Sequence, residues 1–152
     1  MDEDIRKDCV ERALAMHARG YNCAQCVACA LADYTDADAD TLFRLMEGFG
    51  GGMGGFTETC GAISGGIAVL GNRLSGGMDH PHTKGDTYQF ARELVSRFRE
   101  QNGSTLCPEL KGLTGGPVLR SCDGCIVDAV DLTLDLLEVD PEGLKLRSKA
   151  KR

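Results

Sequence analysis

The sequence lacks the features of exported and membrane-spanning proteins. No apolar run in its 152 residues approaches the roughly 20 residues that a transmembrane helix needs. Residues 1–13 mix acidic and basic side chains and contain no apolar stretch of the signal-peptide type. We therefore expect a cytoplasmic protein with no membrane span.

An excess of positive charge is also missing. The chain has 17 Lys and Arg against 23 Asp and Glu, which gives a formal net charge of −6. This balance disfavours non-specific binding to nucleic acid, which depends on basic surfaces. Residues 145–152 are the exception, because they contain five bases and no acid. We expect one domain over residues 1–144, followed by a solvated basic tail over residues 145–152.

Convincing strand patterns are absent, whereas helical spacing of apolar residues recurs along the chain. We predict an all-α, single-domain bundle of five to six helices. Asn22, Asp38 or Asp40, and Ser121 are the expected N-caps of three of them. In the clearest helix, over residues 83–101, Tyr88, Leu94 and Phe98 belong to the expected apolar stripe. The helices are expected over residues 4–19, 22–32, about 40–47, 57–74, 83–101 and 122–138, with a short turn at 107–110.

Glycine is abundant and unevenly placed. Residues 48–55 contain six glycines in eight positions, which disfavours regular structure and indicates a loop. The helix expected over residues 57–74 carries a small-residue face formed by Gly61, Gly65 and Gly66. Such a face permits close approach of another backbone or of a cofactor. Packing within the chain and packing across a homodimer are both open uses of it.

Eight cysteines are present, and structural disulfides are improbable in a reducing compartment. Metal ligation, redox chemistry and plain burial remain as their uses. Cys23, Cys60 and Cys122 lie at or near the starts of expected helices, and Cys107 directly precedes Pro108. A helix N-terminus favours the thiolate, which is the form that binds metals and attacks disulfides. We interpret this placement as a sign of reactive or ligating thiols.

Two Cys-x-x-Cys pairs occur, Cys23 with Cys26 and Cys122 with Cys125. A pair at a helix start can work as a dithiol. Two pairs together could also make a zinc site with four thiolates. The pairs are about 95 residues apart, which is longer than in compact zinc modules and weakens that interpretation. Cys9 and Cys29 fit apolar helix faces and are expected to be buried thiols.

Several blocks of the sequence, in this order and spacing, resemble the C_GCAxxG_C_C family of redox-active proteins. The Cys-Gly-Ala-x-x-Gly segment is the specific part of this resemblance, which covers residues 5–138. The blocks are Gly20-Tyr21-Asn22-Cys23-Ala24-Gln25, Gly48-Phe49-Gly50-Gly51-Gly52-Met53-Gly54, Thr59-Cys60-Gly61-Ala62-Ile63-Ser64-Gly65, residues 98–104 before Cys107, and Cys122 ahead of Ile126-Val127.

The resemblance implies four shared cysteines, which fall on Cys23, Cys60, Cys107 and Cys122. Some relatives carry selenocysteine at the place of Cys60, and an iron–sulfur centre is discussed for related domains of split-Soret cytochromes. This chain adds Cys9, Cys26, Cys29 and Cys125. Of these, Cys26 and Cys125 are alternates for the shared cysteines as metal ligands.

These observations give one leading hypothesis and two alternatives. The leading one is electron transfer through a 2Fe–2S or 4Fe–4S cluster bound by the four shared cysteines, since four thiolates match its ligand count. The first alternative is a thiol–disulfide oxidoreductase, with Cys60 as nucleophile and Cys23 as resolving partner. The second is a zinc-stabilised structural or binding domain. The expected partner is a redox protein or an oxidoreductase, and a homodimer stays open.

Overall fold

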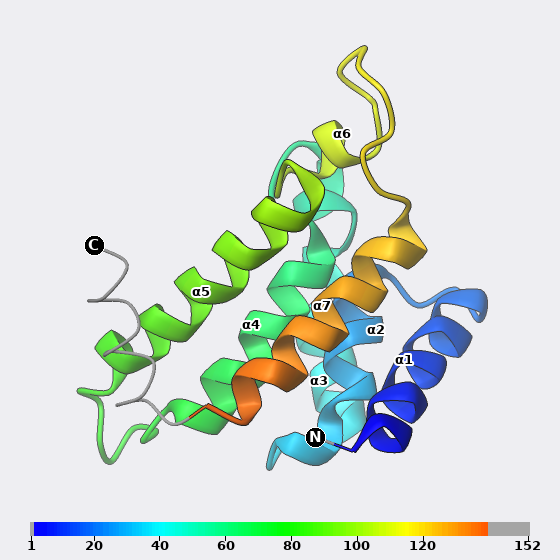
Figure 1. Ribbon diagram of the computed structural model, residues 1–152. Coiled ribbons are helices and arrows are strands. Elements are labelled where there is room, and N and C mark those ends of the chain that lie inside the picture. Colours follow the sequence, from blue (N-terminus) through cyan, green and yellow to red (C-terminus); the bar gives the residue numbers. More distant parts are fainter. Residues whose placement is uncertain (1, 140–152) are drawn as a thin grey trace.

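Helices account for the architecture of the computed structural model, which describes residues 2–139 (Figure 1). The all-α prediction is confirmed, with one helix more than the upper estimate. Within the described residues, the only bridge between extended segments is an isolated antiparallel one. The basic tail at 145–152 lies outside the described part. The α-helices are α1 (Glu3–Ala18), α2 (Cys23–Ala30), α3 (Ala39–Met46), α4 (Gly61–Leu74), α5 (Lys84–Asn102), α6 (Cys107–Leu110) and α7 (Cys122–Leu137).

Side-chain caps set the starts of α2, α3 and α7, as the sequence predicts. Asn22 accepts a hydrogen bond from the Gln25 backbone N–H, and the Gln25 side chain accepts one from the Asn22 N–H in return. Asp38 caps α3, and Ser121 caps α7 by accepting from the Gly124 N–H. Caps satisfy donors that the first helical turn leaves free. They therefore fix where the cysteines at these helix starts stand.

Helix α4 packs against α2, α5 and α7, and its glycines allow these helices to approach closely. A Cβ added at Gly65 would lie 2.6 Å from the carbonyl oxygen of Ala24 on α2. A Cβ at Gly66 would collide with Thr133 of α7 and would lie 2.9 Å from Leu94 of α5. The small-residue face therefore packs inside the chain. Of the two uses left open for it, the structure shows the internal one.

Two expectations about helix detail are wrong. Helix α4 begins at Gly61 rather than at residue 57, because the backbone before it pairs with the segment around Leu106. Tyr88 is 60% exposed, whereas Phe90 is buried together with Leu94 and Phe98. The buried row of α5 thus follows an i, i+4, i+8 spacing toward α4 and α7.

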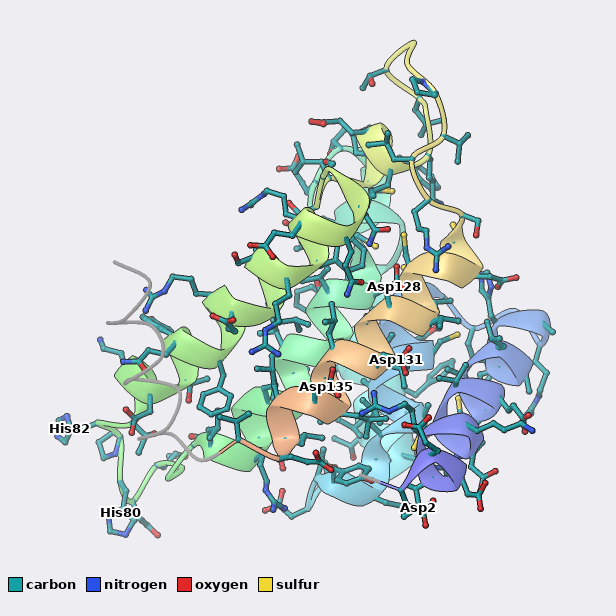
Figure 2. The ribbon with its side chains drawn as sticks, in the orientation of Figure 1. Asp2, His80, His82, Asp128, Asp131 and Asp135 are labelled. Atoms are coloured by element: carbon teal, nitrogen blue, oxygen red, sulfur yellow. The ribbon has the colours of Figure 1, made fainter. Side chains whose placement is uncertain are left out.

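Charged contacts tie α1 to the outside of α7. Asp128, Asp131 and Asp135 follow one another along α7 (Figure 2). The Arg6 guanidinium donates to the Asp135 carboxylate at 2.6 Å and to the Asp131 backbone oxygen at 3.0 Å. Asp128, the first of the three, instead accepts hydrogen bonds from Arg120, which lies just before α7. These charged contacts add to the core contacts that Cys9 and Ala13 of α1 make.

The two ends of the bundle differ. Helix α6 and the starts of α4 and α7 gather at one end, at the top of Figure 1. The loop between α4 and α5, with His80 and His82, lies at the lower left in Figure 2 and projects away from the helices. No helix within residues 2–139 is both long and apolar enough to cross a bilayer. Cys60, Cys107 and Cys122 stand at the starts of α4, α6 and α7 and therefore lie at the upper end of Figure 1.

Candidate functional site

Five cysteines surround one small cavity at the upper end of the bundle. Its volume is about 10 Å³, and two cationic side chains, Lys111 and Arg120, also line it. Each cysteine stands at the start of a helix: Cys23 opens α2, Cys60 is the N-cap of α4, Cys107 opens α6, and Cys122 and Cys125 lie in the first turn of α7. The structure thus brings together the four cysteines that the resemblance implies and one of the two alternates. The lining cysteines are Cys23, Cys60, Cys107, Cys122 and Cys125.

A short antiparallel pairing places Cys60 beside Cys107. Thr59 and Leu106 form the bridge. The Cys60 N–H donates to the Thr105 oxygen at 2.8 Å, and the Cys107 N–H donates to the Glu58 oxygen at 2.8 Å. Two residues far apart in the chain are thereby fixed by backbone hydrogen bonds. The sequence analysis expected a helix over residue 58 and missed this pairing.

The glycine-rich segment wraps the site at backbone level. Gly52 has a φ of +55°, and a Cβ there would lie 2.6 Å from the Cys107 Cβ. The Gly51 N–H donates to the Cys23 sulfur. A Cβ at Gly50 would collide with the side chain of Asn22, the α2 cap. The segment therefore needs glycine at positions 50 and 52, because the Asn22 cap and Cys107 occupy the space where side chains would stand.

Gly61 allows the Cys23 and Cys60 sulfurs to meet. A Cβ on Gly61 would lie 2.5 Å from the Cys23 Sγ and 2.8 Å from the Phe49 carbonyl oxygen. With no side chain there, the thiols of Cys23 and Cys60 hydrogen-bond to each other. Cys60 also hydrogen-bonds to Cys125 of α7. Cys60 is thus the middle member of a row of three thiols, Cys23–Cys60–Cys125.

Contact between the thiols raises the pKa of Cys23 and Cys60, whereas their placement at helix starts predicts a lowered pKa. The hydrogen bond with Cys60, followed by burial, raises the pKa of Cys23. The hydrogen bond with Cys125 raises the pKa of Cys60 from 9.0 to about 12, although Cys23 and the Ala62 N–H act against it. Helix N–H groups do favour these thiolates, but neighbouring thiols and burial outweigh them. Cys23 and Cys60 are therefore protonated near neutral pH.

The two cations at the site were missed by the sequence analysis, since no motif marks them. Lys111 hydrogen-bonds to Cys122 and lies 5.0 Å from the centre of the Phe56 ring. Burial opposes its charge, but Cys122 and the nearby thiols outweigh burial and raise the pKa of Lys111. Arg120 donates to both oxygens of Asp128 at 3.0 Å. Lys111 is thus the cation directed at a thiol, whereas the charge of Arg120 is matched by Asp128.

The remaining cysteines lie elsewhere. Cys26, the other alternate, is buried and donates weakly to the Tyr21 carbonyl oxygen at 3.6 Å. Burial, followed by the proximity of Cys23, raises its pKa to about 12. Cys29 faces the Ala39 oxygen, and Cys9 is buried beside Arg12. Of the two Cys-x-x-Cys pairs, Cys122 with Cys125 is therefore the one with both members lining the cavity.

The thiol donors at the site suit a bound metal centre, but the size of the cavity does not. Five thiols with two nearby cations match the chemistry of a thiolate-ligated, anionic iron–sulfur cluster. The cavity, however, has room for about one water molecule. Within the described residues, no three His, Cys, Asp or Glu side chains are grouped so that they could hold a metal ion. The site as folded therefore does not fit a cluster or zinc without separation of the thiols.

Comparison with known proteins yields one match. Residues 21–136 match the family model described as "Putative redox-active protein (C_GCAxxG_C_C)". No curated protein and no solved structure matches the chain. The matched range includes all five cysteines of the cavity.

Proposed function

The chain belongs to the C_GCAxxG_C_C family of redox-active proteins, and we propose that it acts as a thiol–disulfide oxidoreductase in which Cys23 and Cys60 alternate between two thiols and a disulfide. The observation that carries the proposal is the direct hydrogen bond between these two thiols over the bare backbone of Gly61. Two sulfurs in contact can become bonded with little movement, because a disulfide needs only a short S–S separation.

The described cysteines are all free thiols in this structure, which is therefore the reduced form. Oxidation joins the Cys23 and Cys60 sulfurs and releases two electrons and two protons. The electrons pass to a disulfide of a partner molecule, which is reduced to two thiols. Burial and mutual contact keep both thiols protonated, so the reduced form is unreactive until a partner engages the site.

The test is a redox titration in glutathione buffers, with trapping of free thiols by alkylation and peptide mapping. We expect a Cys23–Cys60 disulfide in the wild-type protein and its loss in Cys60→Ser. Cys26→Ser is the matched control, because Cys26 is buried next to the site without lining it, and this variant should retain the disulfide. A wild-type protein with no disulfide at Cys60 under any buffer would contradict the proposal.

An iron–sulfur electron-transfer protein is the second candidate. The observation that favours it is the number of thiols at one cavity, since dithiol chemistry needs two and this cavity has five. Cys23, Cys60, Cys107 and Cys122 would be its ligands, with Cys125 as an alternate. A bound cluster would supply one-electron transfer. Such binding requires the cavity to widen.

Anaerobic purification followed by a visible spectrum and iron, sulfide and zinc analysis distinguishes the candidates. Colourless, metal-free protein supports the dithiol proposal. Brown protein with near-equal iron and sulfide that is bleached by dithionite establishes the second candidate instead. One zinc per chain, with unfolding on chelation, would indicate a structural zinc domain, the remaining alternative from the sequence.

A further inference from the structure

The dithiol proposal leaves open how an outside molecule reaches Cys60. Cys60 is 6% exposed, and its sulfur lies between those of Cys23 and Cys125. A thiol in this position cannot be attacked by, or attack, the disulfide of a large partner. Cys122, by contrast, is partly exposed at the first position of α7. The site therefore has an outer thiol and an inner pair.

On the premise of the proposed function, we infer that Cys122 and Cys125 form an outer dithiol that passes oxidising equivalents from a partner disulfide to Cys60 and Cys23. The inference rests on one continuous arrangement. The outer pair is a Cys-x-x-Cys at a helix start, and its inner member, Cys125, hydrogen-bonds to Cys60. Cys60 in turn hydrogen-bonds to Cys23.

Cys122 is the member suited to meet the partner. The Lys111 ammonium hydrogen-bonds to its sulfur, and Cys122 is partly exposed. The capped first turn of α7 adds the N-terminal end of a sixteen-residue helix. Cys23 is also partly exposed, but its hydrogen-bond partners are the Cys60 thiol and the backbone N–H groups of Gly51 and Ala24, which carry no charge. The cation therefore distinguishes Cys122 from Cys23 as the attacking group.

Cys125 is the connection between the outer and inner pairs. Its helical spacing from Cys122 is three residues, which places both side chains on the same face of the first turn. Gly124 lies between them, and a Cβ at this position would collide with the Arg120 guanidinium. That guanidinium is held over this turn by its two hydrogen bonds to Asp128.

The exchange balances at each step. Cys122 attacks the partner disulfide, and one partner thiol leaves. Cys125 then attacks the Cys122 sulfur, so that a Cys122–Cys125 disulfide forms and the second partner thiol leaves. Cys60 next attacks the Cys125 sulfur and Cys122 is released, taking up the proton that Cys60 gives up. Finally Cys23 attacks Cys60, which forms the Cys23–Cys60 disulfide and restores the Cys125 thiol.

The test uses full-length reduced protein and one molar equivalent of a chromogenic aromatic disulfide as the probe, followed by peptide mapping. In the wild type we expect rapid release of two coloured thiols per chain and a final Cys23–Cys60 disulfide. In Cys125→Ser we expect release of one coloured thiol and a lasting mixed disulfide on Cys122. In Cys122→Ser the fast release should slow by roughly tenfold or more, because the partly exposed thiol beside Lys111 is lost.

The controls separate this inference from the proposed function. Cys26→Ser should behave as the wild type. If Cys125→Ser or Cys122→Ser forms the Cys23–Cys60 disulfide as fast as the wild type, the relay is wrong while the dithiol proposal stands. If the wild type forms no Cys23–Cys60 disulfide even at equilibrium in glutathione buffers, the proposed function fails. Cys122 is partly exposed, so its serine variant is expected to fold even if Cys125→Ser does not.

Discussion

The sulfur of Cys23 occupies the space where a side chain of Gly61 would stand. A Cβ on Gly61 would lie 2.5 Å from the Cys23 Sγ, closer than non-bonded atoms approach. The residue after Cys60 is therefore glycine because a thiol from another helix lies against it. This relationship gives a physical reason for the Cys60-Gly61 pair of this chain. It also makes Gly61 a sensitive probe of the site.

Gly61→Ala should destabilise the protein by about 1–3 kcal/mol, the usual range for overpacking a tight site. The added methyl group would meet the Phe49 carbonyl oxygen at 2.8 Å as well as Cys23, and backbone cannot move aside as a side chain can. Gly85→Ala in α5 is the control, since nothing lies within 4 Å of its Cβ position. Urea unfolding should show a loss for the first variant and none for the second.

Asn22→Ala should loosen the Cys23 end of the thiol row. Asn22 caps α2 and also donates to the Glu47 oxygen at 2.9 Å, which holds the glycine-rich segment to the helix start. Loss of a cap costs about 0.5–2 kcal/mol. We expect faster alkylation of Cys23, measured by mass spectrometry after brief exposure to iodoacetamide. Asp38→Ala removes the α3 cap, which lies beside Cys29 and does not line the cavity, and should leave the Cys23 rate unchanged.

Asp128→Asn should weaken the cavity wall. Asp128 accepts hydrogen bonds from Arg120 at 3.0 Å and from Asn102 at 3.1 Å, and its side chain is mostly buried. Hydrogen bonds to charged groups contribute about 1.5–3 kcal/mol each, so we expect a loss of roughly that size in the free energy of unfolding. Asp40→Asn disrupts the exposed Arg44–Asp40 pair and should change stability by less than about 0.5 kcal/mol. Equal effects of the two variants would contradict the assigned role of Asp128.

The reduced protein should lose stability as the pH rises from about 9 toward 12. An unfolded cysteine ionises near its ordinary pKa of 9.0, whereas Cys60 ionises near 12 in the folded chain. Between these values the folded state holds more protons than the unfolded state, so unfolding becomes easier as protons are removed. Each such thiol lowers the free energy of unfolding by about 1.4 kcal/mol per pH unit.

Urea unfolding under reducing conditions across this pH range measures the effect. Cys60→Ser cannot ionise there, so its stability should fall less steeply than that of the wild type. Lysine and tyrosine titration is shared by both proteins and does not alter the comparison. Identical slopes would show that Cys60 is not held protonated by its neighbours.

The sequence predicts most of the fold because caps and apolar spacing act locally. Asn22, Asp38 and Ser121 each cap a helix within three residues, so the starts of α2, α3 and α7 are readable from short segments. The grouping of Cys23, Cys60, Cys107 and Cys122 was an expectation from family resemblance. Their presence at one cavity follows from the helix starts meeting at the same end of the bundle.

The site's finer structure depends on contacts that short segments do not encode. Lys111 reaches Cys122 because Leu119 and Arg120, just before α7, donate backbone hydrogen bonds to the Leu110 oxygen at the end of α6. The choice between Cys26 and Cys125 likewise depends on which face of α2 and of α7 turns toward Cys60. The pKa expectation was wrong for the same reason, since it counted the helix N-terminus and could not count the neighbouring thiols.

The bridge between Thr59 and Leu106 has a consequence for how the protein is made. It closes a loop of more than forty residues, and such closures are formed late because their entropic cost precedes their gain. On the ribosome, Cys23 and Cys60 emerge well before Cys107 and Cys125. In nascent chains the Cys23 and Cys60 thiols are therefore exposed until Cys107 and Cys125 have been synthesised and the site can fold. Synthesis under oxidising conditions should thus yield mispaired disulfides that the finished fold would exclude.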